Sequence, residues 1–129
     1  MAALRLAVTL VLALAVAGCA VPPPVPTGLM EVIERPAEKA LLGGWRAYED
    51  AQYPQAEKML AQALQIGLVS SKDRATAHKL LAFIFCTSDR GAACEVEFRR
   101  ARADDPNFTL SKSEAGHPQW GPVYKRVQP

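Results

Sequence analysis

The spacing of apolar residues after residue 35 is that of amphipathic helices. Ala, Leu, Glu, Lys and Gln dominate residues 37–68, and proline is nearly absent from the periodic stretches. This combination favours helix over strand. The pattern therefore predicts an all-α domain over residues 36–129 with four main helices, which are Pro36–Glu49, Pro54–Ile66, Ser71–Cys86 and Ala92–Ala103.

The first pair of helices and the second pair have the same spacing of small and large residues. The intervals are 9, 3, 4 and 3 residues in both pairs, and the offset between them is 38 residues. This spacing resembles the tetratricopeptide repeat (TPR), a helix–turn–helix unit that stacks on its neighbours. The alternative is a generic amphipathic bundle without repeats. The two sets are Gly44, Tyr53, Ala56, Leu60 and Ala63, and then Ala82, Gly91, Cys94, Phe98 and Ala101.

The C-terminal tail has the pattern of a cap on this stack. Two repeats leave an exposed apolar end, which repeat proteins cover with an additional helix. Ser111 and Glu114 have the spacing of a capping box. The apolar residues that follow have the i, i+3, i+4, i+7 spacing of one helical face, so we expect a short capping helix. They are Trp120, Val123, Tyr124 and Val127.

Residues 1–18 have the features of a signal peptide. Arg5 precedes the apolar run Leu6–Val16, which is too short for a membrane span. The motif Val16-Ala17-Gly18-Cys19 that follows resembles a lipobox, at which bacterial lipoproteins are acylated on cysteine and cleaved before it. We therefore expect lipidation at Cys19 and an outer-membrane lipid as its partner. The alternative is an ordinary secreted protein with a free Cys19.

Residues 19–35 are expected to form a lipid-anchored, proline-rich linker. Four prolines fall within residues 22–26 and favour an extended polyproline II spacer. Ala20 rather than Asp follows the cysteine, which by analogy with enterobacterial lipoproteins favours the outer membrane. We therefore expect the protein in the cell envelope, as an outer-membrane lipoprotein that faces the periplasm.

Composition and charge argue against several classes of function. The chain has 129 residues, of which 50% are hydrophobic and 22% charged, and its net charge of +2 is too small to indicate a nucleic-acid partner. His78 and His117 lack the neighbouring ligands and catalytic partners that a metal site or an active site requires. We expect no catalytic residues, no metal, no cofactor and no small-molecule substrate, so the protein is predicted not to be an enzyme.

Two cysteines are placed to close the second helical pair. Cys86 ends one predicted helix and Cys94 lies in the first turn of the next, so an antiparallel hairpin brings them within bridging distance. Export would place them in an oxidising compartment. The sequence predicts a Cys86–Cys94 disulfide, and the alternative is two buried thiols.

The TPR resemblance also implies a binding surface. TPR domains line their concave face with the first helix of each hairpin, and its large side chains would suit a peptide or partner helix. The competing interpretation is that Trp45 and Phe83 pack against the capping tail. The residues that this resemblance assigns to the groove are Leu41, Trp45, Tyr48, Lys79 and Phe83.

The full order of features resembles one group of envelope proteins. A lipobox, a proline-rich tether and two TPR-like hairpins, with the segments Ala82–Cys86, Cys94–Ala101 and Leu110–Val123, resemble the small TPR lipoproteins associated with type VI secretion loci, the TssQ family. The resemblance implies a lipid-anchored periplasmic adaptor or scaffold of the secretion-system envelope complex, with protein partners in the cell envelope. The alternative is a pilotin-like or periplasmic chaperone lipoprotein that assists outer-membrane assembly. An envelope enzyme is disfavoured because the carboxylate and histidine sets for catalysis are missing.

Overall fold

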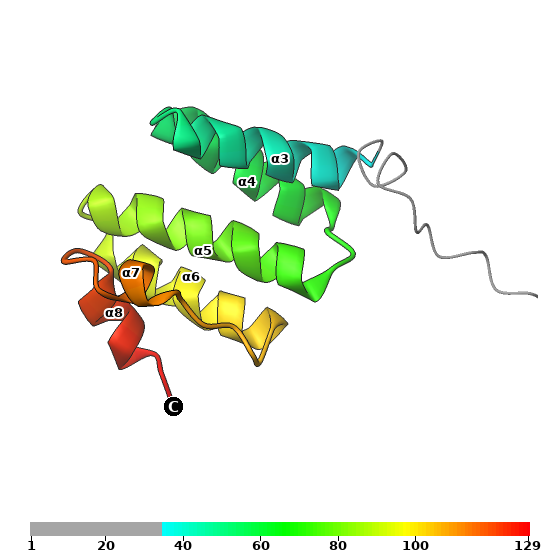
Figure 1. Ribbon diagram of the computed structural model, residues 1–129. Helices are drawn as coiled ribbons and strands as arrows, with labels where there is room; N and C mark the ends of the chain where they lie inside the picture. The colour runs from blue at the N-terminus through cyan, green and yellow to red at the C-terminus, as the bar shows by residue number, and fades with distance from the viewer. Residues whose placement is uncertain (1–34) are drawn as a thin grey trace, which may run out of the picture.

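The computed structural model describes residues 35–129, and within this range the fold is all helical (Figure 1). The predicted fold class is confirmed, and every main helix boundary lies within one residue of its expected place. The helices are α3 (Pro36–Glu49), α4 (Tyr53–Ile66), α5 (Ser71–Thr87), α6 (Gly91–Asp104), α7 (Lys112–Ala115) and α8 (Gly121–Arg126).

The four long helices form two antiparallel hairpins that stack on each other. Helices α3 and α4 pack along their length, as do α5 and α6, and α5 also contacts both α3 and α4. In Figure 1 the turns of both hairpins lie at the same end of the stack, while the chain enters α3 at the opposite end. We call the end with the two turns the turn edge.

The two turns have the same backbone geometry, which supports the repeat over a generic bundle. Ala51 and Asp89 are the two non-glycine residues with positive φ among residues 35–129; both have φ of 58°, and they lie 38 positions apart. The N–H of Gln52 donates to the carbonyl of Ala47 at 2.8 Å. The offset pair repeats the bond, since the N–H of Arg90 donates to the carbonyl of Phe85 at 2.9 Å.

The small residues of the repeat let the helices approach closely. A Cβ atom on Gly44 would lie 2.8 Å from Cγ of Leu60, so this position of α3 has no room for a side chain. Tyr53 and Gly91, the first residues of α4 and α6, are exposed, whereas the remaining repeat residues of the helices have no exposed surface, as their predicted packing role requires. They are Ala56, Leu60, Ala63, Ala82, Cys94, Phe98 and Ala101.

The C-terminal tail covers the second hairpin, as predicted. The Ser111–Glu114 capping box is present and begins α7. In α8, the ring of Tyr124 packs edge-on against Phe98, with centroids 5.5 Å apart, and its hydroxyl accepts a hydrogen bond from the N–H of Leu110 at 3.0 Å. Arg102 of α6 also donates to the carbonyl of Val127. The predicted apolar face of the tail is therefore buried against the stack.

The predictions for the signal peptide, for Cys19 and for nearly all of the linker fall on residues 1–34, outside the described part of the chain. Among residues 35–129, no helix is long and apolar enough to span a membrane.

Candidate functional site

A disulfide closes the second hairpin at the turn edge. Cys86 at the end of α5 and Cys94 at the start of α6 are bonded, with Cα atoms 5.2 Å apart. The predicted pairing is confirmed, and the alternative of two free thiols is wrong. Cys94 is fully buried, so the bond holds the turn from inside.

The five predicted groove residues do not form one open groove. Leu41 and Phe83 belong to the hydrophobic core, with 6% and 3% of their surfaces exposed. The tail covers Phe83, since Trp120 stacks on its ring with centroids 4.1 Å apart. Lys79 is likewise engaged, because its Nζ lies 2.8 Å from Oε1 of Glu114 in α7. The prediction that all five residues line a binding groove is thus wrong, because the chain's own tail fills the second hairpin's half of this face.

The first hairpin's half of the same face stays open. Trp45 is 41% exposed, and its indole Nε1 donates to Glu49 one turn further along α3 at 2.7 Å. The interpretation that Trp45 and Phe83 pack against the tail is right for Phe83, whereas Trp45 has no ring contact with Trp120. Hence the predicted groove is reduced to the surface around Trp45 and Tyr48.

Tyr48 lies between the open surface around Trp45 and the covered surface around Phe83. Its ring lies 5.7 Å from that of Tyr53 and 6.4 Å from that of Phe83, centroid to centroid. Burial, together with the nearby Tyr53 and the carboxylate of Glu114, raises the pKa of Tyr48. The hydroxyl therefore stays protonated and available as a hydrogen-bond donor across the physiological pH range.

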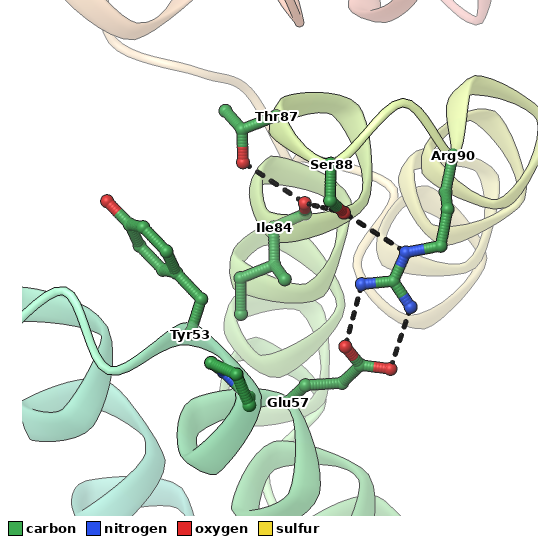
Figure 2. Close-up of a pocket in the computed structure, with 7 residues that line it drawn as sticks. Tyr53, Glu57, Ile84, Thr87, Ser88 and Arg90 are labelled. Atoms are coloured by element: carbon green, nitrogen blue, oxygen red, sulfur yellow. Dashed lines mark hydrogen bonds and ion pairs between the residues drawn. The ribbon is translucent and has the colours of Figure 1, made fainter.

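A pocket of about 220 Å³ opens at the turn edge between the two hairpins (Figure 2). Tyr53 stands on one side of it and Arg90 on the other, with Ile84 between them. The start of α4, the end of α5 and the residue before α6 therefore all contribute to the pocket. Its lining residues are Tyr53, Pro54, Glu57, Ile84, Thr87, Ser88 and Arg90.

The charged groups and the aliphatic hydroxyls of this pocket are already paired. Arg90 binds the Glu57 carboxylate through both terminal nitrogens, at 2.9 and 2.7 Å, and stacks on Phe85 at 4.3 Å. The hydrogen bond from Arg90 lowers the pKa of Glu57, which stays ionised, so the pair carries no net charge. Thr87 and Ser88 donate their hydroxyl protons to backbone carbonyls of α5. The pocket consequently offers a neutral and mostly apolar surface.

Sequence reasoning did not find this pocket. Glu57 and Arg90 are 33 residues apart and belong to no motif. The one sequence signal is the repeat register, because Tyr53 and Gly91 begin the second helix of each hairpin and so bring the residues beside them to one edge.

His78 belongs to a charged cluster between α5 and α6. Its Nδ1 lies 2.5 Å from Oε2 of Glu97, and its Nε2 lies 3.3 Å from Oδ2 of Asp104. Arg74 and Arg100 pair with the other oxygens of these carboxylates, each at 2.7 Å. Because the two ring nitrogens bind carboxylates on opposite sides, the three groups do not converge on one point. Within residues 35–129, no group of three or more His, Cys, Asp or Glu side chains could hold a metal ion.

Comparison of the chain with protein families, with curated proteins and with solved structures finds no match.

Proposed function

We propose that the protein is a lipid-anchored periplasmic adaptor of the cell envelope, and an accessory of the type VI secretion envelope complex. The lipobox-like motif supports the lipid anchor, and the TPR-like repeat supports the adaptor role. The Cys86–Cys94 disulfide is consistent with it, because structural disulfides persist in oxidising compartments such as the periplasm.

The observation that carries the adaptor role is that the tail covers the second hairpin's half of the concave face and leaves the first hairpin's half exposed. On the second hairpin the tail provides a model of how a segment binds there: Trp120 stacks on Phe83 and Glu114 pairs with Lys79. The offset of 38 residues places Trp45 at the position of Phe83. Trp45 is exposed where Phe83 is covered, so the first hairpin offers an aromatic surface for an apolar segment of another protein.

Two variants test the two parts separately. Cys19→Ser should move the protein out of the membrane fraction, since the acyl chains supply the membrane affinity. Trp45→Ala should leave the protein in that fraction but weaken the co-purification of its envelope partner by more than tenfold, as expected for an exposed aromatic anchor. The measurements are fractionation at high salt and affinity purification from solubilised membranes.

Leu42→Ala is the matched control. Leu42 lies on the same helix and is 41% exposed like Trp45, but it is outside the predicted concave set. Equal partner loss from both variants would contradict the assignment of the surface. The chaperone alternative would be favoured if the protein bound a single outer-membrane subunit only transiently. In that case the two would not be found together in the assembled complex.

A further inference from the structure

The turn-edge pocket is not part of the proposed adaptor surface, yet it has the properties of a binding site. Its volume of about 220 Å³ is below the roughly 300–1,000 Å³ of small-molecule sites. A space of this size fits a side chain of a bound segment better than a free metabolite. Because Arg90 and Glu57 neutralise each other, the pocket favours an uncharged occupant.

The surroundings of the pocket narrow the choice of segment. Tyr53 forms one wall and is 42% exposed, and the half-buried ring of Tyr48 lies beside it. Pro54 and Ile84 add apolar surface without a free hydrogen-bonding group in their side chains. Polyproline II segments typically dock against aromatic rings, on which their prolines pack without needing a backbone ladder.

We propose that this pocket and Tyr48 bind the proline-rich segment of the chain itself, residues 20–28. The segment reads Ala-Val-Pro-Pro-Pro-Val-Pro-Thr-Gly and carries no charged side chain, which matches the neutral pocket. Its prolines favour the polyproline II conformation before binding, so little conformational entropy would be lost on docking.

The length of chain between this segment and α3 allows the contact. Helix α3 has 14 residues and is about 21 Å long at 1.5 Å per residue, and it runs from the chain's entry point to the turn edge. The nine residue steps from Pro26 to Arg35 span about 28 Å at 3.1 Å per residue. The linker is therefore long enough to return along α3 and to place the prolines at Tyr48 and Tyr53.

Docking within one chain also makes a small site effective. A segment tethered this closely has an effective concentration in the millimolar range, so a weak contact suffices to keep the site occupied. In the lipid-anchored form, docking would shorten the free tether and keep the turn edge near the acylated cysteine. The proposal does not depend on the adaptor role of the Trp45 surface.

Peptide titration into the full-length protein in mild detergent tests the proposal. The probe is a fluorescent peptide with the sequence of residues 20–28, followed by anisotropy. The wild-type chain should bind it weakly because its own segment occupies the site. A variant with all four prolines at positions 22, 23, 24 and 26 changed to alanine should bind the peptide at least tenfold more tightly. A peptide with alanine in place of each proline is the probe control.

Two further substitutions in the four-alanine variant locate the contact. Tyr53→Ala should weaken peptide binding at least tenfold, whereas Val96→Ala should not change it. Val96 is 43% exposed, close to the value for Tyr53, but it lies on α6 outside the pocket. Both residues are well exposed, so neither variant is expected to unfold the domain.

Four outcomes would overturn the proposal. The peptide could bind neither form, or it could bind equally well after Tyr53→Ala; either result removes the pocket as the site. The wild-type chain could also bind as tightly as the four-alanine variant, which would mean that its own segment is not the occupant. Dimers of the wild-type chain that dissociate in the four-alanine variant would instead identify the occupant as the segment of a second copy.

Discussion

The two hairpins share one backbone plan but are held together differently at the turn edge. Counting back 38 residues, Tyr48 and Ala56 in the first hairpin correspond to Cys86 and Cys94 in the second. The second hairpin is closed by a covalent bond at this place. The first has the backbone hydrogen bond across its turn but no covalent bond, and the Tyr48 ring packs there against Tyr53.

The hairpins also differ in what fills their interiors. Aromatic rings of the second hairpin and the tail form a connected group, in which Phe83 contacts both Phe98 and Trp120, and Phe98 contacts Tyr124. The buried residues within α3 and α4 are mainly alanine and leucine. Aromatic pairs add stabilisation beyond the area that they bury. We infer that the second hairpin and its tail are the stable platform, and that the first hairpin presents the open surface.

The largest expected effect comes from replacing each of the two tryptophans separately with alanine. Trp120→Ala should lower the free energy of unfolding by about 3–5 kcal/mol, because the ring is buried, stacks on Phe83 and donates from Nε1 to the carbonyl of Glu114. Trp45→Ala should change it by about 0.5 kcal/mol or less, since that ring is exposed. Denaturant unfolding of both variants measures the difference, and equal losses would show that the tail is not part of the platform.

A smaller effect is expected from the disulfide. Replacing both Cys86 and Cys94 with alanine should remove about 2–3 kcal/mol, since the bond joins residues only 8 positions apart. For a domain of this size that corresponds to a fall in melting temperature of about 10–20 °C. Hydrogen exchange should rise at the second turn and stay unchanged at the first turn around Ala51. Unchanged melting after removal of the bond would mean that noncovalent contacts alone close both hairpins.

Local signals were sufficient to predict the elements from the sequence. Proline at the first position of α3, the Ser70 cap before α5 and the Ser111–Glu114 box before α7 each act within one helical turn, so a single chain shows them directly. The repeat spacing was equally direct, because the 38-residue offset aligns small residues that had to be buried.

The partners across the fold were not predictable in this way. For Phe83 the sequence left two interpretations open, the concave surface or packing against the tail, and it did not single out Trp120, 37 residues further along, as the contact. It gave no indication that Lys79 would pair with Glu114, 35 residues further along. Helical periodicity gives the face on which a side chain lies and says nothing of which segment reaches it. For the same reason the Glu57–Arg90 pair, and with it the turn-edge pocket, appeared only in the structure.

The smallest expected effect concerns the polar contact that fastens the tail. Burial opposes ionisation of Glu114, but hydrogen bonds from Lys79 and from the Ser111 backbone outweigh it and lower the pKa of Glu114. A lowered folded-state pKa means that the contact stabilises the fold above the usual glutamate range near 4.5, and that this stabilisation is lost as the pH falls through the lowered value. The contribution should be about 1 kcal/mol or less, because the pair is partly exposed.

Glu114→Gln isolates this contribution, because glutamine can keep the capping box with Ser111 while it loses the charge opposite Lys79. We expect the tail of the parent protein to loosen in acid, seen as a red shift of Trp120 fluorescence in a Trp45→Phe background. The Glu114→Gln variant should be slightly less stable at neutral pH and should lack the part of the acid response that comes from Glu114. Glu57 at the turn edge also has a lowered pKa. Glu57→Gln removes that carboxyl and should leave the Trp120 response intact. If Glu57→Gln abolishes the response instead, acid acts between the two hairpins and not at the tail. The ion pair between Lys79 and Glu114 would then not hold the tail in place.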